Sequence, residues 1–161
     1  MKERLPGLPA PPGILPRSVS FTSAPMPANV TLLGRGSLDA ALLVDRPGGN
    51  LAIALYDVAP DGTWTQVDHG ARDLRHARSR ESSDLVTPGL PFNTTVWLYP
   101  EEIVIAKGHS LGLVVSAELA PWYLASPIRG GSYRLFTGDQ ATTLHLLARA
   151  DAAEEVREIL K

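Results

Sequence analysis

Glycine, proline, aspartate and asparagine divide most of this chain into short apolar segments that are rich in β-branched and aromatic residues. The 161 residues include 14 glycines and 14 prolines, which recur at the spacing of turns between strands. Helical periodicity is convincing only in the last residues of the chain. The pattern predicts an all-β fold, an antiparallel β-sandwich, over residues 18–150.

Ten segments are expected to be strands: 18–22, 29–34, 38–44, 51–58, 63–70, 92–99, 103–106, 111–117, 133–137 and 142–147. Segment 51–58 is apolar on both faces and is expected at the centre of a sheet, whereas 63–70 is polar on both faces and is expected at an edge. Pro60-Asp61-Gly62 lies between these two segments. Proline presets φ and glycine admits a positive φ, so we expect a hairpin there.

The two ends of the chain differ from the centre. Residues 1–17 contain five prolines, which fix φ and remove backbone donors, so they predict a linker of polyproline-like geometry. Residues 151–161 predict a short C-terminal helix with Asp151 as its cap and an apolar stripe that includes Val156 and Leu160. Docking of this stripe on the β domain is favoured over a partner-binding helix.

Composition excludes several classes of function. The chain has no cysteine, which removes disulfides, zinc knuckles and thiol catalysis. A net charge of −2 argues against a nucleic-acid partner, which needs a clustered basic excess. No apolar run approaches the roughly 18 residues of a membrane helix, and prolines interrupt the N-terminus where a signal peptide would be apolar. The prediction is therefore a cytoplasmic protein with no membrane contact.

Gly108-His109-Ser110-Leu111-Gly112 matches G-x-S-x-G, the nucleophile elbow of α/β-hydrolases, and Asp139 and His145 follow in the order of a triad. The elbow needs a helix after its serine, but residues 111–117 alternate as a strand does. The chain after Ser110 is also short, because one βαβ unit takes about 30 residues or more. We therefore interpret Ser110 as a look-alike in a turn between strands, and we expect no catalytic residue and no cofactor.

The other chemically active side chains show no recognisable site pattern. The histidines lack the spacing of a metal site, so we expect surface or packing roles and no metal; they are His69, His76, His109 and His145. A group of arginines is interleaved with acids, which favours a solvated, ion-paired loop over a cationic contact patch. These residues are Arg72, Asp73, Arg75, Arg78, Arg80, Glu81 and Asp84.

Several segments, taken in order, resemble one family. Residues 19–25 and 30–34 are similar to an entry motif "F-T-S-x-P-L … v-t-l-x-G", and 54–62 is close to a hairpin motif "L-x-D-V-x-P-D-G", the most specific of these matches. Further matches are residues 70–78, residues 88–89 with 93–98, residues 106–111 and Pro121. The sequence thus resembles the C-terminal β domain of X-Pro dipeptidyl-peptidases and cocaine-esterase-like (CocE/NonD) serine hydrolases. Ser110 stands where that family usually has arginine.

This resemblance implies a jelly-roll, galactose-binding-like fold. It also implies that the domain packs, in cis or in trans, on an α/β-hydrolase catalytic domain and helps to shape the surroundings of its active site. The catalytic serine, acid and histidine of the family belong to that other domain, so none is transferred to this chain.

Two other functions stay open. A stand-alone module that binds a carbohydrate or a small ligand would need an aromatic platform, for which the sequence offers Trp64, Trp97, Trp122 and Tyr123. Of these, Trp64 and Trp122 are expected to be exposed. A self-contained esterase acting through Ser110 is the third and least favoured hypothesis. A homo-oligomer is compatible with the sequence.

Overall fold

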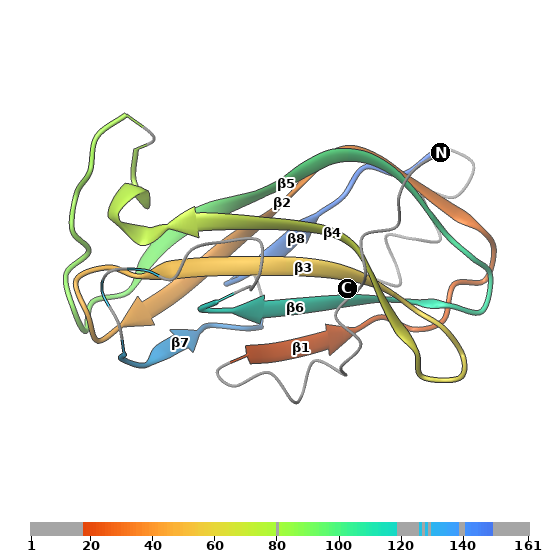
Figure 1. The fold of residues 1–161 in the computed structure, drawn as a ribbon, viewed down its shortest axis with the longest axis horizontal. Coiled ribbons are helices and arrows are strands. Elements are labelled where there is room, and N and C mark those ends of the chain that lie inside the picture. Colours follow the sequence, from red (N-terminus) through yellow and green to blue (C-terminus); the bar gives the residue numbers. More distant parts are fainter. Residues whose placement is uncertain are drawn as a thin grey trace.

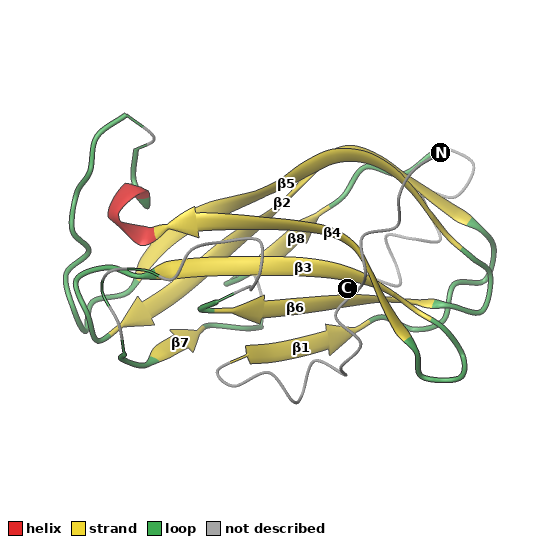
Figure 2. Ribbon diagram, in the orientation of Figure 1, coloured by secondary structure: helices red, strands yellow, loops and turns green. Residues whose placement is uncertain are grey.

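The computed structural model describes residues 18–79, 81–118, 126, 128, 130–138 and 141–149. These residues form strands and a single turn of 3₁₀ helix, η2, which spans Leu74–His76 (Figures 1 and 2). The strands are β1 (Ser18–Thr22), β2 (Val30–Val44), β3 (Asn50–Val58), β4 (Trp64–Asp73), β5 (Phe92–Ile105), β6 (Ser110–Ser116), β7 (Tyr133–Leu135) and β8 (Thr143–His145). The expected linker 1–17 and helix 151–161 lie outside the described residues.

The strands are arranged in two antiparallel sheets. Sheet A has the order β1-β6-β3-β4, and sheet B has the order β5-β2-β7, with β8 also paired to β2. The predicted all-β antiparallel sandwich is therefore confirmed. The central position of β3 and the edge position of β4 in sheet A are confirmed as well.

Two pairs of predicted strands are in fact single long strands. Segments 29–34 and 38–44 are both part of β2, and segments 92–99 and 103–106 are both part of β5. β2 continues through the predicted break. The pairing with β5 shifts between Arg35 and Ser37, because two residues of β5 there lie opposite one residue of β2, which is a bulge in β5. The glycines beside Arg35 are typical of a turn, but here they permit a bulge within a continuous ladder. Pro100 fits within β5 because β5 is an edge strand of sheet B.

The hairpin between β3 and β4 forms as predicted. The amide of Ala59 donates to the carbonyl of Thr63 at 2.9 Å, and the amide of Gly62 donates to the carbonyl of Ala59 at 2.9 Å. Gly62 has φ = 85°, a conformation that side-chain-bearing residues adopt at a cost.

Apolar side chains cover both faces of β3. Leu51, Ile53 and Leu55 point into the main core between the sheets, and Tyr56 belongs to a second apolar cluster on the other face. Trp64 packs on this second cluster, with its ring edge-to-face with that of Tyr56 at 5.4 Å. The expectation that Trp64 is exposed is wrong, because a tryptophan at this edge position finds apolar partners across the sheet.

The two sheets meet where β4 runs beside β5. A Cβ at Gly70 would overlap the carbonyl oxygen of Trp97, so the backbones of the two strands are in contact there. Only glycine permits this approach, because every other residue would separate the strands. The contact joins an edge of sheet A to an edge of sheet B.

We predict that Gly70→Ala lowers the free energy of unfolding by at least about 2 kcal/mol, because the new methyl group meets backbone that cannot rotate away. Urea unfolding followed by tryptophan fluorescence measures this loss. Gly62→Ala is the matched control: its Cβ has open space, and only the positive φ is penalised, at about 1 kcal/mol. Equal losses in the two variants would show that the contact between Gly70 and Trp97 is not tight.

Candidate binding site at the β4–β5 corner

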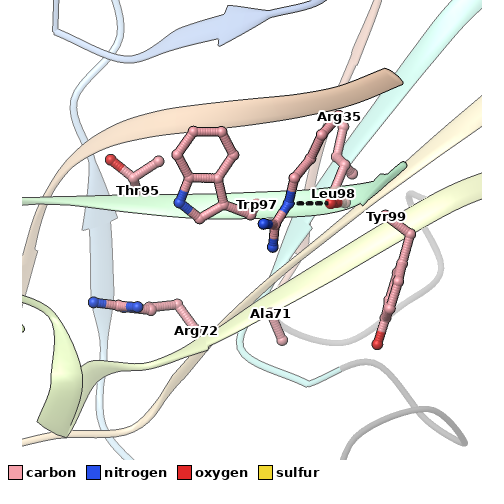
Figure 3. Close-up of a pocket in the computed structure, with 7 residues that line it drawn as sticks. All are labelled: Arg35, Ala71, Arg72, Thr95, Trp97, Leu98 and Tyr99. Carbon is pink, nitrogen blue, oxygen red and sulfur yellow. Dashed lines mark hydrogen bonds between the residues drawn. The ribbon is translucent and has the colours of Figure 1, made fainter. Parts of the chain in front are cut away.

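A surface pocket of about 280 Å³ opens beside this contact between β4 and β5. Its lining residues come from three strands, as Figure 3 shows: Arg35 from β2, Ala71 and Arg72 from β4, and Thr95, Trp97, Leu98 and Tyr99 from β5. The pocket therefore spans both sheets, and its shape depends on how closely they approach.

Strand alternation presents the aromatic side chains of the pocket. Leu98 is buried in the core at 1% exposure, whereas Trp97 is 40% exposed and Tyr99 is 51% exposed. The predicted strand over residues 97–99 is confirmed, and Trp97 points to the opposite side from Leu98, as alternation in a strand requires. Two large aromatic side chains consequently flank the pocket at its surface.

Arg35 lies over Trp97, beside the bulge of β5 at Leu98 and Tyr99. The Nε–H of Arg35 donates to the carbonyl of Leu98 at 3.1 Å (Figure 3). The guanidinium carbon lies 5.1 Å from the centre of the indole ring, within the range of a cation–π interaction. These two contacts hold the planar guanidinium in one orientation at the pocket.

Arg72 adds a second guanidinium, which donates from Nη2 to the carbonyl of His76. Along the same segment, Arg75 pairs with Asp73 at 2.6 Å, and Arg78 pairs with Asp84 at 3.1 Å. The predicted ion-paired loop is therefore confirmed for these two pairs, and Arg72 is one of the residues that line the pocket. Arg80 lies outside the described residues.

Asp68 supports the pocket from the corner between the strands. Asp68 as a residue is only 6% exposed, and its Oδ1 accepts hydrogen bonds from the amides of His69 at 2.6 Å and Tyr99 at 3.2 Å. Burial raises the pKa of Asp68 to about 6, although the two amide donors oppose this rise. The His69 ring lies 5.1 Å from that of Tyr99, and burial lowers the pKa of His69.

A second polar group lies beside the pocket on sheet B. Asp39 accepts a hydrogen bond from the hydroxyl of Thr95 at 2.7 Å, and the Nε2 of His145 lies 3.1 Å from its other oxygen. The side chains of His145 and Asp39 are 55% and 56% exposed, so His145 lies at the surface. Thr95 links this group to the pocket.

Ser110 is the first residue of β6, where it pairs with Val58 of β3. A turn at Gly108, with φ = 81°, connects β5 to β6. The predicted strand–turn–strand context of Ser110 is therefore confirmed. Its neighbour His109 is paired with Asp57 through Nδ1 at 2.7 Å, and His145 lies on the other sheet. That Ser110 has no catalytic role stays a prediction.

The remaining sequence candidates are dispersed. The Nδ1 of His76 lies 3.1 Å from the carbonyl oxygen of Ser82. Within the described ranges, histidine and acidic side chains form no group of three or more that could hold a metal ion. Trp122, Tyr123 and Asp139 lie outside the described residues. In the part of the chain that the structure describes, no helix is long and apolar enough to cross a membrane.

The sequence analysis did not select Arg35, Asp39 or Asp68. The only local signal for Arg35 is its position between Gly34 and Gly36, which also fits a turn. No neighbouring residue in the sequence indicates the role of Asp68, because the second amide that donates to it belongs to Tyr99 on another strand.

The fold and its corner pocket define a two-sheet β domain, and the comparisons give its family. Residues 15–152 match the model of the X-Pro dipeptidyl-peptidase C-terminal non-catalytic domain. The chain belongs to this family, as the sequence motifs predicted. A search of curated proteins finds no match.

Solved structures share the fold. An aminopeptidase from the marine sediment archaeon Thaumarchaeota archaeon aligns with a TM-score of 0.77 and 11% identity over 85% of this chain and 26% of its own. An α-amino acid ester hydrolase aligns with a TM-score of 0.74 and 16% identity over 83% of this chain and 26% of its own. A CocE/NonD family hydrolase from Staphylococcus aureus aligns with a TM-score of 0.70 and 14% identity over 81% of this chain and 30% of its own. The chain thus spans less than a third of each of these proteins.

We predict that Asp68 makes stability depend on pH. Its raised pKa means that the folded state binds more protons than the unfolded state between pH 3.8 and about 6. The contribution is favourable below pH 3.8 and is lost as the pH rises through 6. Asp68→Asn keeps a side-chain oxygen that accepts from the two backbone amides, but it removes the buried negative charge. It should therefore raise the free energy of unfolding at pH 7.5 by about 1 kcal/mol, a value discounted for solvent screening.

Urea unfolding of the wild type and Asp68→Asn at intervals from pH 4 to pH 8 measures this effect. The variant should lack the decline in stability between pH 4 and about pH 6. Glu81→Gln, at an exposed position, is the control and should keep the wild-type profile. A decline over this range that persists in Asp68→Asn would contradict the assignment to Asp68.

Proposed function

We propose that this chain packs, in cis or in trans, against an α/β-hydrolase catalytic domain and shapes the surroundings of its active site. The observation that supports this most directly is the match of residues 15–152 to a domain described as the non-catalytic C-terminal part of X-Pro dipeptidyl-peptidases. The partial coverage of the solved hydrolases is consistent with one domain of a larger enzyme. For the whole protein, the corresponding proposal is a peptidase or esterase that acts in the cytoplasm.

The composition of the β4–β5 corner supports a docking role. Trp97 and Tyr99 are exposed on one strand, and Arg35 lies over the ring of Trp97. Tryptophan, tyrosine and arginine are the residues most enriched at the energetic centres of protein interfaces. A partner surface that covers this corner would bury two aromatic side chains that water now contacts.

The alternative is a module that binds a carbohydrate or another small ligand. One observation favours it: the exposed indole of Trp97 lies beside polar side chains, because Thr95 lines the same pocket and bonds to Asp39. Sugar-binding surfaces combine an aromatic face with hydrogen-bonding groups in this way. Binding of the isolated chain to a glycan array, abolished by Trp97→Ala, would favour this alternative over a docking domain.

The docking function is tested by co-expressing the tagged full chain with α/β-hydrolase catalytic domains encoded in the same genome. We expect one of them to co-purify in a 1:1 ratio and to gain thermal stability, because binding the folded state stabilises it. An unrelated β-sandwich protein with the same tag is the control. If no catalytic domain co-purifies and none changes its melting temperature, the proposal is wrong.

We predict that the purified chain has no esterase or peptidase activity of its own and that Ser110→Ala changes nothing measurable. A serine hydroxyl stays protonated at neutral pH unless a base accepts its proton, and His145 lies on the other sheet from Ser110. Hydrolysis of p-nitrophenyl acetate and labelling by a fluorophosphonate probe are the measurements. Labelling of the wild type that disappears in Ser110→Ala would contradict the prediction.

A further inference from the structure

The contacts of Arg35 leave one edge of its guanidinium directed to the pocket. The side chain has five N–H donors, and the Leu98 carbonyl takes the one at Nε. Among the residues that the structure describes, no carboxylate lies within ion-pair distance of Arg35. The paired Nη1 and Nη2 groups form the fork that binds a carboxylate through two parallel hydrogen bonds.

The lining of the pocket around this fork is positive. Its seven residues include Arg35 and Arg72 and no acid. Three acids lie outside the lining: Asp39 bonds to Thr95, Asp68 accepts amide hydrogen bonds at the base of the corner, and Glu101 pairs with Gly34 in the ladder beyond Tyr99. An anion in the pocket therefore meets two guanidinium groups without a carboxylate in the lining to repel it.

The walls of the pocket select among anions. Trp97 and Tyr99 provide apolar surface beside the charged groups. A carboxylate on a short methylene stem can contact these rings while its oxygens face Arg35. The volume of about 280 Å³ is just below the roughly 300–1,000 Å³ of small-molecule sites, so it suits one inserted side chain.

We propose that this pocket receives the carboxylate of a glutamate or aspartate side chain from the catalytic domain. The inference rests on the proposed docking function and names the group that would be recognised. The Arg35 fork binds the carboxylate, Arg72 adds attraction, and Trp97 and Tyr99 cover the stem. Trp97 also stacks on Arg35 and so keeps the fork in place before the partner arrives.

The carboxylate chemistry is tested on the isolated full chain by NMR. The probe is N-acetylglutamate methylamide, whose only charge is the side-chain carboxylate, and the matched neutral probe is N-acetylglutamine methylamide. We expect saturable shifts of the Arg35 Nε–H and Trp97 indole N–H signals at millimolar concentrations of the acid only. No shift, equal shifts with the neutral probe, or tighter binding of inorganic phosphate would each overturn the inference.

The source of the carboxylate is tested on the complex with the co-purifying catalytic domain. Arg35→Met should weaken this complex at least about 10-fold, and Arg35→Lys, which keeps the charge but not the fork, should weaken it less. Arg134→Met, an equal charge change at the exposed position of β7, should leave the affinity unchanged. Circular dichroism and melting curves establish that each variant is folded.

The outcomes separate the two proposals. If the wild type and Arg35→Met bind the catalytic domain equally, the carboxylate inference is wrong and the docking function stands. If the wild type binds no catalytic domain, both proposals are wrong, even where the glutamate probe binds, and that binding then identifies a site for free carboxylate ligands.

Discussion

The bulge in β5, where Leu98 and Tyr99 lie opposite Gly36 of β2, is the constraint on which the β4–β5 corner depends. Arg35 pairs with Pro100 and Ser37 pairs with Trp97, so the shift leaves Leu98 and Tyr99 without regular partners in β2. Backbone groups near a core require hydrogen-bond partners. Side chains supply them here, since Arg35 donates to the carbonyl of Leu98, and Asp68 accepts from the amide of Tyr99.

These side-chain hydrogen bonds to the backbone of β5 explain why charged residues lie at the pocket. A side chain that satisfies the Leu98 carbonyl must be a donor of sufficient length, and Arg35 provides one while its remaining donors stay at the surface. On the other strand, Asp68 reaches from sheet A to sheet B, so it holds the edges together beside the contact between Gly70 and Trp97. The structural roles of Arg35 and Asp68 thereby create a charged, aromatic-lined corner.

The sequence was sufficient to predict those features of the fold that depend on residues close together in the chain. The turn at residues 60–62 follows from proline and glycine chemistry, and the central place of β3 follows from apolar side chains on both of its faces. The pocket was not predictable in the same way, because Arg35 and Asp68 acquire their roles only after β2, β4 and β5 have paired. Trp64 shows the same limit: its packing depends on Tyr56 and on Gly112, which come from two other strands.

The G-x-S-x-G match at residues 108–112 has a structural explanation in this fold. Gly108 adopts φ = 81° in the turn before β6, a conformation that favours glycine. Gly112 lies in the ladder between Thr22 and Tyr56, and a Cβ there would overlap the ring of Trp64. In a nucleophile elbow, by contrast, the glycines permit a sharp turn from a strand into a helix. Each glycine of this motif is therefore accounted for by a turn or by packing between strands, and neither requires a nucleophile at Ser110.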